Sequence, residues 1–183
     1  MQDTFGRKIT YLRLSVTDLC NLRCRYCMGA EGVEKRAHSE MCSLEQLRDI
    51  AAAAAACGVR KIRLSGGEPL VRRGIVELCR MLREIPGIEE LCLTTNGVLL
   101  PALAAPLRAA GVDRLNISLD TLRPDRFRDI TRTTGGVTTV LSTAAQQAQL
   151  FEDFINSSDC LKDHRGELLE RNTCRQPFVN QVD

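Results

Sequence analysis

The chain of 183 residues has no tryptophan, only two tyrosines and two histidines, and no marked excess of either charge. Its net charge of +2, from 25 basic and 23 acidic residues, predicts neither a nucleic-acid nor an anionic membrane surface. No apolar run approaches the ~20 residues that cross a bilayer. The first eight residues also lack the apolar segment of a secretory signal. We therefore expect a cytoplasmic protein with neither a membrane nor a nucleic-acid partner.

Cysteine is the residue type that the chain has in excess, with nine copies. The odd count, the missing export signal and a length sufficient for a core all exclude a disulfide scaffold. Cys20, Cys24 and Cys27 lie within eight residues at a C-x3-C-x2-C spacing that suits ligands of one metal centre. Zinc normally takes four protein ligands, for which His38 is a candidate. A cubane iron–sulfur cluster held by three thiolates leaves one iron open.

Strand-like and helix-like segments alternate along the chain, which predicts an α/β fold of parallel strands with right-handed crossovers. Strands are expected at residues 9–16, 61–65, 91–95 and 115–119. Helices are expected from a capping box at 43–46 through 56, and at 74–85, 101–110, 124–130 and 137–148.

Four unusual loops follow the four predicted strands, and ligand sites of such folds gather at the carboxyl ends of strands. The first is the loop that contains Cys20, Cys24 and Cys27, called the cysteine loop below. The others are Gly66–Pro69, Thr94–Gly97 and Ser118–Asp120. The two glycines at 66 and 67 would let the backbone approach a ligand closely. An ordinary strand-to-helix turn is the alternative reading of that loop, since a glycine-rich loop alone is weak evidence.

These motifs together resemble a known family. The cysteine triplet with Tyr26 between its last two members, and the sequence Gly66-Gly67-Glu68-Pro69, are similar to the radical S-adenosylmethionine superfamily. Within it, residues 5–141 resemble the GTP 3′,8-cyclases of molybdenum cofactor biosynthesis. The narrower resemblance rests on the segments 12–18, 25–28, 63–70, 93–97 and 116–120.

The resemblance implies an incomplete (β/α) partial barrel of the radical S-adenosylmethionine type. It implies conversion of GTP to cyclic 3′,8-dihydro-GTP by way of a 5′-deoxyadenosyl radical, with an electron donor for the cluster. It also implies the following residue roles. Cys20, Cys24 and Cys27 hold one 4Fe–4S cluster; Tyr26, Gly67 and Ser118 contact S-adenosylmethionine; and Arg13, Arg63 and Thr94 contact GTP.

The pattern breaks after about residue 141, and we expect a partial-barrel core at 1–148 and a divergent polar tail at 149–183. Cys160 and Cys174 share a spacing with the family's second cluster site, but their sequence neighbourhood differs. We therefore expect one cluster in a C-terminally incomplete enzyme, whose activity is open. Two alternatives remain: another radical S-adenosylmethionine enzyme, and a non-catalytic fragment. The oligomeric state, including a homodimer, is open.

Overall fold

The computed structural model describes residues 2–33, 41–121 and 123–133. The expected helix at 137–148, the domain boundary at 148 and the tail at 149–183 lie outside the described residues. The same holds for His38, Cys160 and Cys174.

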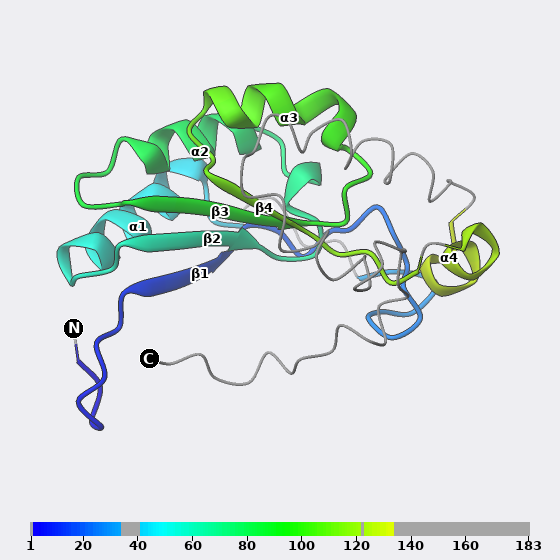
Figure 1. Ribbon diagram of the computed structural model, residues 1–183, viewed down its shortest axis with the longest axis horizontal. Helices are drawn as coiled ribbons and strands as arrows, with labels where there is room; N and C mark the ends of the chain where they lie inside the picture. The colour runs from blue at the N-terminus through cyan, green and yellow to red at the C-terminus, as the bar shows by residue number, and fades with distance from the viewer. Residues whose placement is uncertain (1, 34–40, 122, 134–183) are drawn as a thin grey trace, which may run out of the picture.

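Strands and helices alternate along the described chain, as the sequence predicts (Figure 1). The elements are β1 (Tyr11–Ser15), α1 (Leu44–Ala56), β2 (Lys61–Ser65), η2 (Pro69–Val71), α2 (Ile75–Arg83), β3 (Glu90–Thr95), α3 (Leu100–Ala109), β4 (Arg114–Ile117) and α4 (Pro124–Thr131). Only the short 3₁₀ helix η2 was not expected, and β4 ends two residues before its predicted end.

The four strands form one parallel sheet in the order β1-β2-β3-β4. Each strand is joined to the next through a helix, so all four carboxyl ends lie at the same edge of the sheet (Figure 1). The predicted α/β arrangement of parallel strands is confirmed. Within the described chain, β1 and β4 are the two edge strands.

The two faces of the sheet differ because successive side chains of a strand point to opposite faces. Ile62 and Leu64 of β2 and Leu91 and Leu93 of β3 are fully buried. They lie in the core that α1, α2 and α3 cover from one side of the sheet (Figure 1). The alternate positions, among them Arg63, Thr94 and the buried Cys92, project to the opposite face, which no described helix covers in this way.

Helix α1 begins at the capping box that the sequence predicts. Ser43 Oγ accepts a hydrogen bond from the Gln46 amide at 3.2 Å, and Gln46 Oε1 accepts one from the Ser43 amide at 2.8 Å. This reciprocal pairing satisfies two amides that a helix start leaves without partners. Ala51 and Ala55 are buried, and their small side chains bring the helix close to its neighbours.

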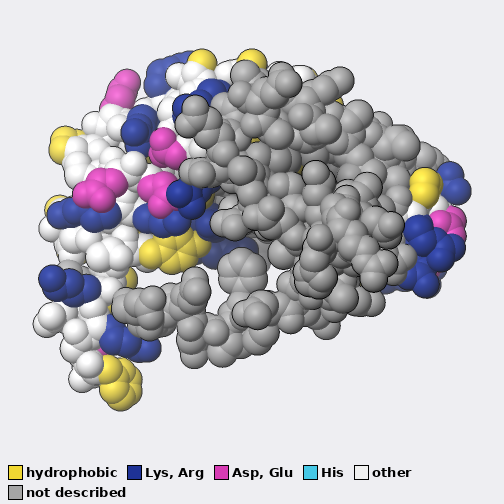
Figure 2. Space-filling model, viewed as in Figure 1, with side chains coloured by type: hydrophobic (Ala, Val, Ile, Leu, Met, Phe, Trp, Pro, Cys, Tyr) yellow, Lys and Arg dark blue, Asp and Glu magenta, His cyan; other side chains and the backbone are white. Residues whose placement is uncertain are grey.

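Ion pairs join neighbouring strands at their amino ends, opposite the edge where the four unusual loops lie. Glu90 pairs with Lys61 at 2.7 Å and with Arg114 at 3.1 Å, across three adjacent strands. Figure 2 shows acidic and basic side chains side by side at this end of the molecule. Burial raises the pKa of Glu90, but hydrogen bonds from Lys61 and Cys92 and the two nearby cations outweigh it and leave the pKa lowered.

Two further expectations concern cysteines and membranes. All seven cysteines of the described residues are free thiols, in line with the rejection of a disulfide scaffold. None of the helices that the structure describes is both long and apolar enough to cross a bilayer.

Candidate functional site

The cysteine loop begins directly after β1, at the carboxyl edge of the sheet. Cys20 and Cys24 are partly buried, and Cys27 is exposed. The amides of Cys27 and Met28 both donate to the Cys24 carbonyl, at 2.9 and 3.1 Å, so the loop closes into a tight turn around that residue. The Leu22 amide lies 3.4 Å from the Cys20 sulfur, in the geometry of a hydrogen bond to a thiolate.

Cys20 and Cys24 lie close enough to the neighbouring thiols to feel their charge. Burial is the main cause that raises the pKa of Cys20 and that of Cys24, and the charge of Cys27 raises both further. Like charges gathered in one loop cost free energy unless a cation compensates them. A metal ion or cluster bound to the thiolates would supply that compensation, because metal ligation requires the deprotonated form.

The spacing of the thiols bears on which metal centre they suit. Within residues 2–33, 41–121 and 123–133, no three Cys, His, Asp or Glu side chains converge tightly enough to hold a single metal ion. A cubane cluster binds each of its thiolates to a different iron, so its ligands stand farther apart than those of one tetrahedral ion. Three cysteine thiols in one loop are the donor set that holds a 4Fe–4S cluster with one iron left open.

Gly66 and Gly67 follow β2 and lie against the backbone of the cysteine loop. A Cβ on Gly66, whose φ is +139°, would lie 2.2 Å from the Thr17 carbonyl oxygen. A Cβ on Gly67 would lie 2.3 Å from that of Leu19. The sequence suggested close approach to a ligand, whereas the structure shows close approach to the chain's own loop. The contact of Gly67 with S-adenosylmethionine stays a prediction.

Glu68 fixes this junction from inside the protein. Its side chain is only 1% exposed and accepts three hydrogen bonds, from the Leu70 amide at 3.0 Å, Thr95 Oγ1 at 2.7 Å and the Asn96 amide at 2.7 Å. Its own amide donates to the Leu19 carbonyl at 2.8 Å. Burial raises the pKa of Glu68, and the three hydrogen bonds offset part of that rise. Glu68 therefore ties the ends of β2 and β3 to the cysteine loop.

Asn96 extends the connection to the first cysteine. Its side-chain amide donates to Asn21 Oδ1 at 2.7 Å and lies 3.9 Å from the Cys20 sulfur. The sequence placed Asn96 in the Thr94–Gly97 loop at the carboxyl ends of the strands, but it did not predict this contact. No spacing rule predicts it, because 76 residues separate Asn96 from Cys20.

Tyr26 and Ser118 mark the side of the cysteine loop near the end of β4. The Tyr26 hydroxyl donates to Asp120 Oδ2 at 2.6 Å, and the ring is 68% exposed. Burial of the hydroxyl and its bond to Asp120 raise the pKa of Tyr26 well above its usual range, so the hydroxyl stays protonated. Ser118 is held by its amide, which donates to the Thr95 carbonyl at 2.8 Å.

Arg63 and Thr94 lie together on the polar face of the sheet. Arg63 Nη1 donates to Asn116 Oδ1 in a short hydrogen bond and lies 3.4 Å from Thr94 Oγ1. Arg13 lies beside Arg63 in the strand register, and its Nε donates to Ser65 Oγ at 3.0 Å. The structure thus brings together the three residues predicted for GTP. Asn116 was missed as a partner, although its alternation with the apolar residues of β4 places it on the same face.

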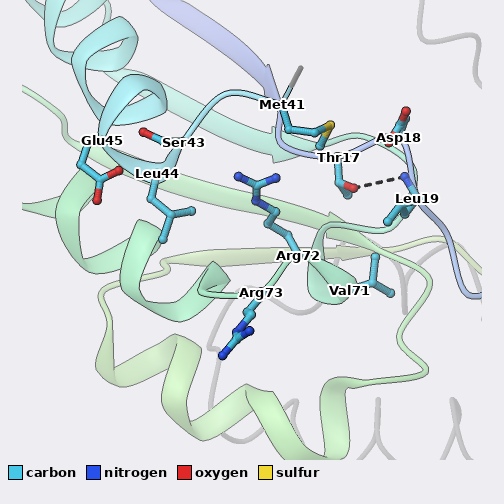
Figure 3. A pocket seen from close by; sticks show the side chains of 10 residues that line it. All are labelled: Thr17, Asp18, Leu19, Met41, Ser43, Leu44, Glu45, Val71, Arg72 and Arg73. Carbon is cyan, nitrogen blue, oxygen red and sulfur yellow. Dashed lines mark hydrogen bonds between the residues drawn. The ribbon is translucent and has the colours of Figure 1, made fainter. Parts of the chain in front are cut away.

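A cavity of about 470 Å³ lies beside this arrangement and shares Thr17 and Leu19 with it (Figure 3). It is formed by the segment after β1, the start of α1 and the residues after η2, and Arg72 reaches across it to donate to the Cys42 carbonyl at 2.6 Å. None of the nine site residues predicted from sequence lines this cavity.

The chain is similar over most of its length to proteins of a known superfamily. The family model of the radical SAM superfamily matches residues 14–155, which include the three cysteines. A protein named GTP 3′,8-cyclase from Geobacter sulfurreducens is 65% identical over 130 residues, 71% of this chain and 40% of that protein. One of the same name from Moorella thermoacetica is 56% identical over 140 residues, 76% of this chain and 43% of that protein. The chain thus spans about two fifths of these relatives.

Solved structures share the fold at low sequence identity. Streptococcus suis SuiB, solved bound to S-adenosylmethionine, matches 77% of this chain and 30% of that one, with a TM-score of 0.61 and 19% identity. The FeFe-hydrogenase maturase HydG from Carboxydothermus hydrogenoformans matches 86% of this chain and 42% of its own chain, with a TM-score of 0.56 and 16% identity. The fold and the family model together show that this chain belongs to the radical SAM superfamily, whose cofactors are a 4Fe–4S cluster and S-adenosylmethionine.

Proposed function

We propose that this chain carries the S-adenosylmethionine-cleaving core of a GTP 3′,8-cyclase of molybdenum cofactor biosynthesis, acting in the reducing cytoplasm with a separate electron donor. The observation that carries the proposal is the common edge of the sheet, where the cysteine loop meets the polar face that holds Arg13, Arg63 and Thr94. Relatives of that name at 56–65% identity support it. Because the chain spans about 40% of their length, the activity of the whole enzyme is part of the proposal.

The cysteine loop and the loop after β2 have the cofactor role in this proposal. Cys20, Cys24 and Cys27 would hold the cluster, and Tyr26, Gly67 and Ser118 would contact S-adenosylmethionine. When reduced, the cluster supplies the electron that cleaves S-adenosylmethionine and yields a 5′-deoxyadenosyl radical. The protein's own contribution would be to hold the three thiols in one loop at the edge of the sheet and to present Arg13, Arg63 and Thr94 on the polar face of the same sheet.

The polar face of the sheet has the substrate role. A guanidinium presents several donors in a fixed plane, which suits purine acceptors and phosphate oxygens. Asn116 and Thr94 restrain Arg63, and Ser65 restrains Arg13, so both forks are oriented before a ligand arrives. Restraint of this kind lowers the entropy that binding costs.

Replacing Arg63 by methionine tests the substrate assignment. We expect GTP to bind about tenfold more weakly or worse, because a charge-assisted hydrogen bond contributes about 1.5–3 kcal/mol. Isothermal titration of the reconstituted protein with GTP measures this change. The control Arg80→Met removes an exposed guanidinium of α2 that pairs with Glu77, and should leave the affinity unchanged. Equal GTP affinity in parent and Arg63→Met would favour a different radical SAM substrate.

Cleavage of S-adenosylmethionine tests the cofactor assignment independently of GTP. With dithionite as reductant, we expect the reconstituted chain to form 5′-deoxyadenosine and the Cys24→Ser variant to form none, because two thiolates cannot hold the site-differentiated cluster. Chromatography of the nucleoside product is the measurement. Equal formation by both proteins would contradict the assignment of Cys24 as a ligand. We expect little cyclic product from GTP with this chain alone.

A further inference from the structure

The C-terminal turn of α4 contacts the part of the cysteine loop that runs from Arg23 to Met28. The amide of Arg23 donates to the Thr131 carbonyl at 3.0 Å, and that of Arg25 to the Ile130 carbonyl at 2.9 Å. The last carbonyls of a helix have no partners within the helix, and the amides of an irregular loop need acceptors. The two segments therefore satisfy each other's backbone groups.

Two arginine side chains strengthen this contact from opposite directions. Arg25, between Cys24 and Tyr26, donates from Nε to the Asp129 carbonyl at 2.9 Å and from Nη2 to Asp129 Oδ1 at 2.6 Å. Arg132, at the end of α4, donates from Nη1 to the carbonyls of Arg23 at 3.4 Å and Met28 at 3.1 Å. Because Arg23 precedes Cys24 and Met28 follows Cys27, one guanidinium connects both ends of the two-cysteine turn.

Helix α4 is itself fixed to the core. Phe127 is buried in the main hydrophobic cluster, and buried Thr131 donates from Oγ1 to the Phe127 carbonyl at 2.7 Å. A rigid path thus runs from the core through Phe127 to the cysteine turn. The backbone of Arg132 has a φ of +52°, in the left-handed region that disfavours residues with a side chain.

We propose that Arg132 and Arg25, with the last turn of α4, are positioning residues for the iron–sulfur cluster. They hold the Cys24–Cys27 turn in the conformation that presents both thiolates to the metal. The inference rests on the proposed cofactor role of the cysteines and adds a second layer of residues to it. Mutation of residues that orient metal ligands typically lowers metal affinity by about 10- to 100-fold.

The test replaces Arg132 by glycine, which accepts a positive φ without strain and removes the guanidinium together with the rest of the side chain. Parent and variant, each as the full chain, are reconstituted anaerobically with iron and sulfide. Iron loss to a chelator is then followed at the cluster's visible absorbance. We expect about tenfold faster loss from Arg132→Gly, altered g-values of the reduced cluster in electron paramagnetic resonance, and an unchanged or higher melting temperature. Arg132→Lys, which keeps a charged donor, should restore part of the retention.

Arg128→Ala is the matched control, because it removes another exposed guanidinium from the last turn of α4. It should lose iron at the parent rate. Asp129→Asn, at an exposed position, weakens the contact between Arg25 and α4 and should also accelerate iron loss. If Arg132→Gly melts at a lower temperature than the parent, the rate of iron loss from Asp129→Asn becomes the test of the positioning role. Parent-like retention and g-values in both Arg132→Gly and Asp129→Asn would overturn the positioning role alone. A parent chain that binds no cluster would overturn this inference together with the cofactor role.

Discussion

Gly67→Ala is expected to destabilise the protein by about 3 kcal/mol or more and to prevent cluster assembly, even without S-adenosylmethionine present. The new methyl group would lie 2.3 Å from the Leu19 carbonyl oxygen and 2.6 Å from that of Asp18. These are backbone atoms, so no side-chain rotation relieves the clash. The loop must move, which breaks the hydrogen bonds from the Gly67 amide to Thr17 and from the Glu68 amide to Leu19.

Gly29→Ala is the control in the same part of the chain. A Cβ there would lie 3.0 Å from Glu31 Oε2, the mobile end of an exposed side chain, and should cost little. Urea unfolding of the metal-free proteins and iron content after reconstitution are the two measurements. If Gly67→Ala unfolds with the parent midpoint and binds the same iron, the loop after β2 does not support the cysteine loop as described.

Glu68→Ala is expected to cost about 2–4 kcal/mol, because it removes the acceptor of three hydrogen bonds at a buried position. The amides of Leu70 and Asn96 would then lack the acceptor that they have now. The loss should reach the metal site, since Asn96 also supports Asn21 and Cys20. Chemical denaturation at pH 7 measures the cost. Glu89→Ala is the control at an exposed carboxylate whose ion pair with Arg60 is long, at 3.9 Å, and it should change stability by less than about 0.5 kcal/mol.

The same carboxyl group predicts a pH dependence. Burial raises the folded-state pKa of Glu68 above 4.5, so the folded protein binds its proton more readily than the unfolded chain. This group therefore contributes more stability as the pH falls through its raised pKa toward 4.5, and loses that contribution as the pH rises. Glu68→Gln cannot titrate, so the stability difference between parent and variant should change with pH in that window. A constant difference from pH 7 to 4.5 would contradict the raised pKa.

Local patterns in the sequence were sufficient for the fold. The alternation in segments such as Lys61–Ser65 gave the strands, and the capping box at Ser43 gave the start of α1. Parallel pairing followed from the intervening helices, because connections of that length return the chain to the same end of the sheet. The 3₁₀ helix at Pro69–Val71 was missed, since three residues carry no periodic signal.

The sequence predicted the parts of the site that are formed by residues close together in the chain. It did not predict contacts between residues far apart in the chain. The cysteine triplet and the polar residues of β2 and β3 are visible in short windows. The contacts of Asn96 with Cys20, and of Arg132 with the cysteine turn, join residues 76 to 109 positions apart. Gly66 and Gly67 were recognised as unusual, but only the folded chain shows that their missing side chains make room for the backbone at Thr17 and Leu19.

Anaerobic reconstitution with quantification of iron and sulfide is the most direct test of the central claim, that Cys20, Cys24 and Cys27 hold one site-differentiated cluster. The account predicts about four irons per chain, a reduced-state paramagnetic signal that changes when S-adenosylmethionine is added, and loss of both in Cys24→Ser. A stoichiometric single zinc ion, about eight irons, or a signal insensitive to S-adenosylmethionine would contradict it.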